Sequence, residues 1–295
     1  MGLNWPVPEL PEVEALAQEL STSLGGQRVV SCHLISFSAL KTFAPPIGEL
    51  EGSRLVACRR FGKQLGLDFG ALWLVIRFAR GGWVRMRPEP AAAGGRRGDV
   101  ALRLSFSGSD PESPEVGLEV SEAGTEKRLG LWVVRRPTEV PSVAALGPDP
   151  LSSEFTLSRL ESVLDASNST LKSALTDQSR IGGIGNAYSD EILHRARLSP
   201  FRLTRSLDSR ERLDLHHAIV DVLEKATRAA IAASPRPTRH RREGLRVHGR
   251  AGERCPVCQD VIRLVSYAER SLFYCPTCQT GGRLLADRRM SRLLR

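Results

Sequence analysis

Apolar residues recur at helical spacing just after the start of the chain, where residues 8–14 read Pro-Glu-Leu-Pro-Glu-Val-Glu. One face of a helix with about 3.6 residues per turn collects the apolar side chains of Leu10, Val13, Leu16, Ala17 and Leu20. Proline is tolerated in a first helical turn, and acidic side chains there complement the helix dipole. The pattern therefore predicts an amphipathic helix that begins within this motif.

Further along, the apolar residues occur in short runs rich in Val, Leu and Ile, which clusters of Gly and Pro separate. Runs of this length and spacing predict antiparallel strands of a sandwich or barrel. The expected strands cover residues 28–36, 54–60, 64–69, 72–78, 99–106, 116–120 and 130–135. The Gly- and Arg-rich residues 87–98 are expected to form a mobile loop.

The character of the chain changes after a Gly-Pro-Asp-Pro sequence at residues 147–150, so we place a domain boundary around residue 145. Helical patterning then appears near residues 156–165, 169–178, 187–196 and 207–233. A loop rich in Pro and Arg at residues 234–242 leads to a cysteine-rich part. We therefore predict an α+β multidomain protein. Its expected parts are an opening helix with an antiparallel β-sandwich at 8–145, a helical domain at 146–240, a cysteine-rich module at 241–282 and a basic tail at 283–295.

The six cysteines fall into two groups. Cys32 and Cys58 stand alone in apolar runs and are expected to be buried. The other four form two Cys-x-x-Cys pairs separated by sixteen residues, namely Cys255, Cys258, Cys275 and Cys278. This spacing is typical of zinc-ribbon knuckles on a β-hairpin, and four thiolates close a tetrahedral site without an open position for substrate. We therefore predict one structural Zn²⁺ ion.

Charge and hydropathy narrow the class of partner. The 295-residue chain has a formal net charge of +9, and arginines cluster on both sides of the cysteine motif. This sign favours a polyanionic partner such as nucleic acid, although a basic protein without such a partner has the same net charge. No run approaches the ~18 apolar residues of a membrane span, and the first residues do not read as a signal peptide. We expect a cytoplasmic, nucleoid-associated protein without a membrane partner.

The opening motif resembles that of the formamidopyrimidine-DNA glycosylase family (Fpg/Nei), bacterial enzymes that excise oxidised bases from DNA. The resemblance extends over essentially the whole chain after Val7. Residues 181–188 read Ile-Gly-Gly-Ile-Gly-Asn-Ala-Tyr, and in the family this segment lies in a helix–two-turns–helix element that binds DNA. The opening motif, the Gly-rich segment and the zinc ribbon follow one another in the family's order. The resemblance thus implies a base excision repair enzyme with a helix–two-turns–helix domain and a zinc finger.

The resemblance implies a bifunctional DNA glycosylase and AP lyase that acts on oxidised bases such as 8-oxoguanine or formamidopyrimidines. Pro8 then supplies the amine that attacks the sugar C1′ and forms a Schiff base, and β- and δ-elimination follow. Glu9 looks like the family's general acid/base carboxylate. The same glutamate also suits a helix start as a dipole-compensating residue. Glu12 matches a second family glutamate, which supports the site.

Pro8 attacks only as a free amine, and in this chain Met1 to Val7 precede it. A free α-amine has a pKa of about 8, whereas the nitrogen of an internal proline is an amide without a usable lone pair. Val7 stands where the family's initiator methionine stands, and a GTG codon encodes valine internally but initiates with methionine. We therefore hypothesise that translation starts at codon 7. The alternative is a real extension that silences the amine.

The resemblance also assigns residues to the DNA backbone around the lesion. Lys63 matches a lysine on a strand turn beside the lesion phosphate, and without that role it is simply an exposed strand-end residue. Asn186 either caps the helix after the Gly-rich turn or binds phosphate. Arg270 matches the arginine at the tip of the zinc hairpin, and Tyr188 supports the site. Such contacts give register and affinity without base choice.

Several positions depart from the family's pattern. Fpg-type members fill the gap left by the flipped base with a methionine, an arginine and a phenylalanine, and these positions hold Arg80, Lys127 and Leu129 here. Leu129 keeps the character of an apolar wedge, Arg80 can contact the orphaned base, and Lys127 with Arg128 adds basic DNA contacts. Ser179 stands where a lysine is common. We therefore expect a divergent member, for which the resemblance implies neither the opposite base nor 8-oxoguanine as the preferred substrate.

Two other functions stay open at this point. A catalytically silent protein of the same fold would bind lesions or abasic sites with a blocked amine. A zinc-ribbon nucleic-acid adaptor unrelated to repair would leave the opening motif and the Gly-rich turn unexplained. For the leading function we expect a monomer on damaged double-stranded DNA. The basic tail at residues 283–295 either adds a DNA contact or packs on the zinc module.

Overall fold

The computed structural model describes residues 7–88, 98–107, 114–123, 126–233, 244–267 and 270–285. Some of the expectations above concern residues outside these ranges. They are the extension before Val7, residues 89–97 of the expected mobile loop, the Pro- and Arg-rich loop at 234–242 and the tail from residue 286. Within the described ranges, no helix has both the length and the apolar character needed to cross a membrane.

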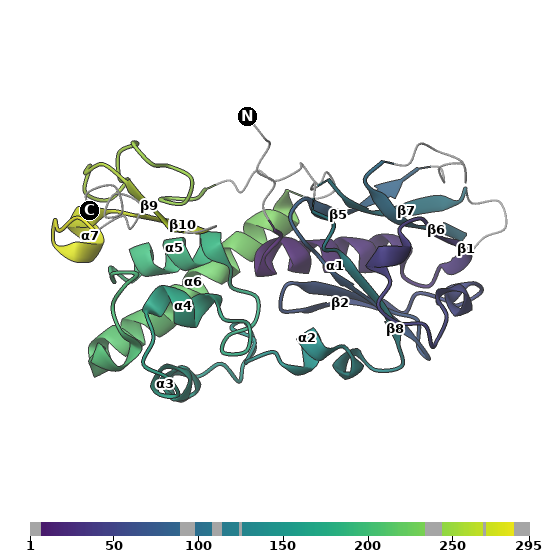
Figure 1. Ribbon diagram of the computed structural model, residues 1–295, viewed down its shortest axis with the longest axis horizontal. Helices are drawn as coiled ribbons and strands as arrows, with labels where there is room; N and C mark the ends of the chain where they lie inside the picture. Colours follow the sequence, from purple (N-terminus) through teal and green to yellow (C-terminus); the bar gives the residue numbers. More distant parts are fainter. Residues whose placement is uncertain are drawn as a thin grey trace. The chain divides into compact units, whose positions relative to one another are not determined.

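The contacts within the chain divide it into two compact units. Unit 1 comprises Met1–Ala145 and Thr227–His240, and unit 2 comprises Leu146–Ala226 and Arg241–Arg295. In Figure 1, unit 1 contains the purple and blue sheets, and unit 2 contains the green helices and the yellow hairpin. Each unit has its own core and its own candidate functional residues, so we describe them separately.

Unit 1 opens with helix α1 (Leu10–Leu24), which the apolar spacing predicts. Glu9 is its N-cap residue, and Pro11 lies in the first turn, where the N–H that proline lacks would have no helical partner. The five apolar residues predicted for one face are all buried. Four of them, from Val13 to Leu20, belong to the core of the unit.

Two four-stranded antiparallel sheets form most of unit 1 (Figure 1). The first, in the order β1-β6-β7-β5, contains β1 (Arg28–Leu34), β5 (Gly82–Arg87), β6 (Val100–Ser107) and β7 (Val116–Glu122). The second, in the order β2-β3-β4-β8, contains β2 (Ala57–Phe61), β3 (Gln64–Asp68), β4 (Trp73–Arg77) and β8 (Gly130–Val134). The sequence pattern predicts every strand except β5. Two arginines interrupt the apolar character of β5, and its pairing with β7 is a tertiary contact.

The apolar faces of both sheets and of α1 meet in one hydrophobic core. Leu65 on β3, Leu102 on β6 and Val120 on β7 are fully buried there. The predicted β-sandwich with an opening helix is therefore confirmed. Short helical turns connect these parts, namely η1 (Phe37–Ala39), η2 (Ile47–Leu50), η3 (Pro137–Glu139) and α2 (Pro141–Ala144).

Unit 2 begins with a set of helices. They are α3 (Leu157–Asp165), α4 (Leu171–Thr176), α5 (Asn186–Arg195), η4 (Thr204–Ser206) and α6 (Ser209–Ala232), whose last residues group with unit 1. Thr156 and Thr170 cap α3 and α4, since each hydroxyl accepts a hydrogen bond from a backbone N–H three residues further on. All four predicted helices are present. Helix α4 ends before Gln178, whose side chain holds the following turn.

The C-terminal part of unit 2 is an antiparallel hairpin followed by a short helix, with β9 (Arg263–Tyr267), β10 (Arg270–Tyr274) and α7 (Pro276–Thr280). Leu285 packs against a small apolar cluster on this hairpin. Its backbone N–H donates to the hydroxyl of Tyr274 at 2.8 Å. The tail therefore begins by packing on the hairpin, as far as Leu285.

Candidate catalytic residues and metal centre

Pro8 and Glu9 lie at the buried start of α1, and Glu9 is only 3 % exposed. The backbone N–H of Glu9 donates to Glu12 Oε2 at 2.8 Å, in a capping box. Glu12 thus fixes the direction in which the chain enters the helix. The supporting role of Glu12 in a catalytic site stays a prediction.

Lys63 lies in the tight turn between β2 and β3. Phe61 and Gln64 pair across the two strands, so Gly62 and Lys63 form a two-residue loop. Gly62 has φ +58°, a left-handed conformation that glycine adopts without strain. The sequence therefore places Lys63 at a hairpin tip, as expected of a strand-turn lysine.

An ion pair joins this hairpin to α1. Arg60 Nε donates to Glu14 Oε2 at 2.8 Å, and the Arg60 side chain is only 7 % exposed. Arg60 lies three residues before Lys63, and Glu14 lies in the helix that begins beside Glu9. The pair thus links the elements that carry Lys63 and Glu9. Sequence reasoning missed it because the two residues are far apart in the chain.

Leu129, expected as an apolar wedge, lies in the core of unit 1 and is 2 % exposed. The carboxylate of Glu122 holds it there, since Glu122 Oε1 accepts hydrogen bonds from the backbone N–H groups of Arg128 and Leu129 at 2.8 and 3.0 Å. A wedge requires an exposed side chain. The structure therefore corrects this expectation: Leu129 fills the core, whereas Arg80 and Lys127 are exposed.

The basic side chains beside Leu129 are engaged at the surface. Lys127 Nζ donates to Asp99 Oδ1 at 3.2 Å and to the backbone carbonyl of Glu122. Arg128 forms an ion pair with Glu126 at 2.8 Å, with both side chains more than 70 % exposed. Exposed pairs contribute at most about 1 kcal/mol. Lys127 and Arg128 can therefore leave these partners and bind a polyanion with little loss of free energy.

In unit 2, Gln178 holds the Gly-rich turn before α5. Its Oε1 accepts from the backbone N–H of Gly183 at 2.9 Å, and its Nε2 donates to the carbonyl of Ile184 at 2.8 Å. Gly183 has φ +91°, which a residue with a Cβ rarely adopts. This glycine is therefore required by the backbone, as the Gly-rich pattern indicates.

Asn186 is the first residue of α5, and Gly185 is the N-cap. The expectation that Asn186 caps the helix is therefore wrong. Its side chain points to the hairpin instead, where Nδ2 donates to the carbonyl of Ser271 at 2.7 Å. Ser271 directly follows Arg270, the first residue of β10. The structure thus brings Asn186 beside the strand that carries Arg270, and Tyr188 is buried two residues further along.

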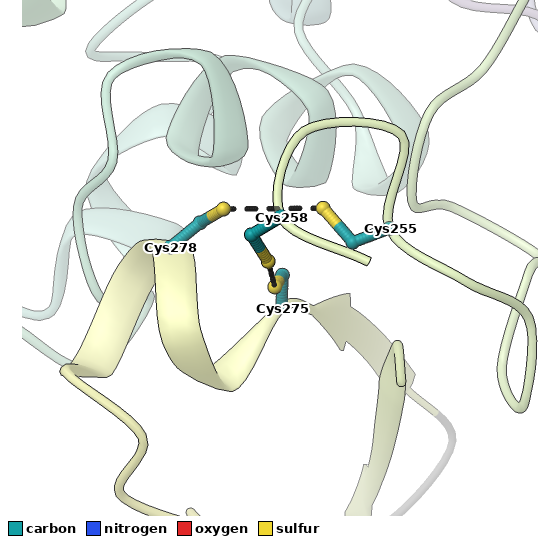
Figure 2. A group of neighbouring side chains, drawn as sticks. All are labelled: Cys255, Cys258, Cys275 and Cys278. Atoms are coloured by element: carbon teal, nitrogen blue, oxygen red, sulfur yellow. Dashed lines mark hydrogen bonds between the residues drawn. The ribbon is translucent and has the colours of Figure 1, made fainter. Parts of the chain in front are cut away.

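The four cysteines of the zinc-ribbon pattern converge on one point in unit 2 (Figure 2). The Sγ atoms of Cys258 and Cys275 are 3.3 Å apart, those of Cys255 and Cys278 are 3.9 Å apart, and all four lie within 4.8 Å of one another. Tetrahedral Zn–S bonds of about 2.3 Å place the sulfur atoms about 3.8 Å apart. The donor set therefore fits one structural Zn²⁺, as predicted.

The surroundings of the cysteines also suit a cation. Burial raises the pKa of the Cys278 thiol to about 12, so it becomes a thiolate only beside a positive charge such as Zn²⁺. His194 on α5 places Nε2 3.3 Å from Cys255 Sγ. Burial lowers the pKa of His194 to about 4, so its imidazole is neutral. With its hydrogen on Nε2, this neutral ring can donate to the Cys255 thiolate, and hydrogen bonds of this kind orient metal ligands.

Glu191 on α5 anchors the segment that leads to the zinc site. Its carboxylate accepts backbone hydrogen bonds from Arg246, Val247 and His248 at 2.8 to 2.9 Å. Burial raises its pKa in spite of these three bonds. Glu191 is 5 % exposed, so water has little access to these hydrogen bonds. The three bonds attach the segment to α5.

Comparison with known proteins follows the same division of the chain. Residues 7–120 match the family model described as formamidopyrimidine-DNA glycosylase N-terminal domain. Residues 146–235 match the H2TH domain of formamidopyrimidine-DNA glycosylase, and residues 252–281 match the zinc finger found in FPG and IleRS. The first match begins at Val7, directly before Pro8.

Three similar proteins illustrate the likeness. A formamidopyrimidine-DNA glycosylase of Methylococcus capsulatus is 30 % identical over 290 residues, with 92 % of this chain and 100 % of the relative covered. An uncharacterized formamidopyrimidine-DNA glycosylase-like protein of Mycobacterium tuberculosis is 48 % identical over 156 residues, which are 52 % of this chain and 98 % of the relative. The structure of Lactococcus lactis Fpg in complex with DNA containing an abasic site has a TM-score of 0.80 at 26 % identity, covering 92 % of this chain and 99 % of that one.

The sandwich with its opening Pro-Glu helix, the H2TH helices and the four-cysteine zinc finger together define a class of zinc-containing DNA repair proteins. Within that class, the chain belongs to the formamidopyrimidine-DNA glycosylase family.

Proposed function

We propose that this protein is a DNA glycosylase that removes damaged bases from duplex DNA. We propose that the protein also cleaves the abasic product as an AP lyase, and that both steps require a free nitrogen on Pro8. The observation that carries the proposal is the buried Pro8-Glu9 start of α1 in a chain of this family. The relative solved with DNA that contains an abasic site supports DNA as the ligand. The net charge of +9 complements such a ligand.

In the first step the damaged nucleotide leaves the base stack. The nitrogen of Pro8 then bonds to C1′ of the sugar while the bond between C1′ and the base breaks, and the base leaves with the bonding electron pair and takes a proton from water. Glu9 takes the proton from the Pro8 nitrogen and returns one to the ring oxygen O4′ as the sugar ring opens. The products of this step are the free base and an iminium ion that joins Pro8 to C1′.

The iminium ion makes the C2′ proton acidic. Loss of this proton expels the 3′ phosphate, which is β-elimination, and a second elimination expels the 5′ phosphate. Water then releases the sugar remnant from Pro8. The gap that remains carries a phosphate at each end, so the products differ in length and charge from those of a pure glycosylase.

Lys63, Asn186 and Arg270 are proposed to bind the phosphates on either side of the flipped nucleotide. Lys63 lies at a hairpin tip, where an ammonium group reaches the backbone of a ligand. Asn186 donates to the carbonyl of Ser271, the residue that follows Arg270 on β10. Guanidinium groups bind phosphate in a bidentate way. These contacts are expected to set affinity and register, with base choice left to other groups.

Oxidised purines such as 8-oxoguanine and formamidopyrimidines are the proposed substrate class. The space left by the flipped base is filled differently from the pattern of Fpg-type members, because Leu129 belongs to the core. Arg80 is exposed at the turn after β4 and is proposed to contact the orphaned base. A polar group in this position reads hydrogen-bond partners on the opposite base, whereas an apolar wedge does not.

One observation favours a second candidate function. In the 295-residue chain, the nitrogen of Pro8 forms an amide with Val7 and has no usable lone pair. A protein that keeps this amide would bind lesions or abasic sites through the same phosphate contacts without forming an imine. The two functions therefore differ in the state of one nitrogen atom.

Borohydride trapping on a duplex with an abasic site tests the proposal. Three forms are compared: the 295-residue chain, a chain that begins at Pro8 after removal of an initiator methionine, and the same short chain with one glycine before Pro8. Borohydride reduces an imine to a stable amine, so each adduct is measured as a covalent protein–DNA band. We expect an adduct from the chain that begins at Pro8 and none from the other two.

Equal adducts from all three forms would mean that another amine, such as that of Lys63, is the nucleophile. No adduct from any form, together with tight binding to the abasic duplex, would place the protein in the lesion-binding class. Binding no tighter to abasic than to intact duplex would exclude both functions. Binding is measured by fluorescence anisotropy with the same duplexes.

A further inference from the structure

A buried chain of polar groups in unit 2 takes no part in the mechanism above. It joins Lys172 on α4, Asp190 on α5 and His248 in the segment before the zinc site. Lys172 Nζ donates to Asp190 Oδ1 at 2.6 Å, and His248 Nδ1 lies 2.7 Å from Asp190 Oδ2. Because a carboxylate only accepts, Nδ1 of His248 carries the hydrogen. Lys172 and Asp190 are 3 % and 1 % exposed, so both charges are buried.

The same ammonium group reaches Asn186. Lys172 Nζ donates to the backbone carbonyl of Asn186 at 2.7 Å. The side chain of Asn186 donates in turn to the carbonyl of Ser271 on β10 at 2.7 Å. An unbroken series of hydrogen bonds therefore runs from His248, through Asp190 and Lys172, to Asn186 and the zinc hairpin.

His248 is held on three sides. Its backbone N–H donates to Glu191 Oε1 at 2.8 Å, and its ring packs edge-on against Phe273 of β10 with the ring centroids 4.9 Å apart. The third contact is the bond from its Nδ1 to Asp190. His248 thus connects the segment before the zinc site, helix α5 and the hairpin at one point.

We infer that Asp190 and His248 are positioning residues for Asn186, and that they act through Lys172. The inference rests on the proposed function, in which Asn186 binds a phosphate of the DNA. Asp190 has two oxygen atoms, and the histidine and the lysine each hold one of them. If the histidine donor is lost, the carboxylate turns its full charge toward Lys172, and the ammonium is drawn away from the carbonyl of Asn186. The zinc-side segment therefore sets the position of the phosphate-binding asparagine.

Three substitutions at His248 isolate the Nδ1 hydrogen bond. His248→Asn keeps an N–H donor at the place of Nδ1, His248→Gln moves the donor to the place of Nε2, and His248→Leu removes it. The buried pair of Lys172 with Asp190 stays intact in all three, so each variant is expected to fold. Zinc content and the thermal unfolding curve verify this. The probe is a duplex with a tetrahydrofuran abasic-site analogue, which the enzyme cannot cleave.

We expect His248→Leu and His248→Gln to bind this duplex about tenfold more weakly, because remote substitutions in a coupled network change affinity by roughly this factor. His248→Asn is expected to bind within about twofold of the wild type, on the same scale. If the ring had a purely structural role, His248→Gln would bind the duplex more tightly than His248→Asn, or the two variants would bind it equally well. Equal affinities for all three variants would overturn the inference.

A double-mutant cycle tests whether His248 acts through Asn186. If it does, His248→Leu weakens binding in the wild-type background and has no further effect in Asn186→Ala. Effects that add in full would show that His248 acts elsewhere, and would overturn the inference while leaving the proposed function intact. If Asn186→Ala itself binds as the wild type does, the proposed phosphate contact fails, and the inference fails with it. The salt dependence of Kd separates the cases further, since loss of a phosphate contact lowers its slope.

Discussion

The two units hold their candidate functional residues by different means. In unit 1, α1 and both sheets share one large apolar core, and the ion pair of Glu14 with Arg60 joins the helix start to the Lys63 hairpin. In unit 2, the apolar clusters beside the zinc site are small. Asn186 is held there by a buried lysine and by the hairpin that the four cysteines close.

The candidate residues of the two units are thus held by different kinds of interaction, namely apolar burial in one case and buried charges and a metal site in the other. Burial of apolar area in unit 1 requires no particular partner, and its contribution is spread over many side chains. A buried ion pair or a metal site is an all-or-none arrangement. Removal of one charged group or ligand leaves the others without a partner in the low-dielectric interior of the protein. The geometry proposed for Asn186 should therefore fail at single points, whereas the start of α1 should tolerate single losses in the core.

The largest expected effect comes from zinc removal or from Cys275→Ser. Zinc-finger peptides bind structural zinc with apparent free energies of about 10–16 kcal/mol, which is comparable to the whole stability of a typical domain. We expect the amides of β9 and β10 to lose their protection against hydrogen exchange. The amides of β3 in unit 1 should keep theirs. Hydrogen exchange followed by mass spectrometry measures both regions in one sample.

Cys32→Ser is the matched control, since Cys32 lies on β1 and outside the four-cysteine cluster. It should leave zinc content and the protection of the hairpin unchanged. Protection of β9 and β10 that survives complete removal of zinc would break the comparison, because the zinc hairpin would then depend on packing as unit 1 does.

The next effect is expected from Lys172→Met, which leaves Asp190 charged and buried without its lysine. Breaking a buried ion pair by removing one partner costs about 3–5 kcal/mol. Lys225→Met is the control, because Lys225 pairs with Asp221 on α6 with a side chain that is 65 % exposed. An exposed helix pair contributes about 0.3–0.5 kcal/mol. Denaturant unfolding of the zinc-loaded protein measures both losses, and equal losses would refute the assignment of Lys172 to the stability of unit 2.

The features that sequence reasoning predicted are local ones. Helix α1 follows from apolar residues three and four apart, and the zinc site follows from two Cys-x-x-Cys pairs that each form one knuckle. Gly183 follows from a turn that demands a left-handed residue. In each case the residues that decide the structure lie within a few positions of one another, so their spacing carries the information.

The features that were missed depend on contacts between distant segments. Lys172 and His248 meet on Asp190, yet they lie 18 and 58 positions from it in the chain. Leu129 has the apolar side chain that a wedge requires. Only the hydrogen bonds from its loop to Glu122 direct this side chain toward the core. Asn186 reads as a helix cap, but Gly185 takes that position and frees the amide for Ser271. No spacing rule contains these pairings.

The smallest expected effect is in unit 1, where Glu119 on β7 accepts hydrogen bonds from Arg87 at 2.9 Å and from Arg103 at 3.1 Å. Burial alone would raise the pKa of Glu119, but the two guanidinium groups outweigh it and lower the pKa below the ordinary value of 4.5. The folded state then binds fewer protons than the unfolded state as the pH falls through this range, so the glutamate stabilises the fold above pH 4.5 and loses that contribution in more acidic solution.

Glu119→Gln should therefore lower the free energy of unfolding at pH 7 by about 1.5–3 kcal/mol, the contribution of hydrogen bonds to a charged group. The difference from the wild type should shrink as the pH falls below 4.5. Denaturant unfolding at a series of pH values measures this difference. Because Leu118 and Val120, on the opposite face of β7 from Glu119, keep the apolar core continuous, the variant should unfold in one step with α1 still attached. A variant that instead loses α1 before the sheets would mean that the start of α1, like the zinc hairpin, depends on single polar contacts.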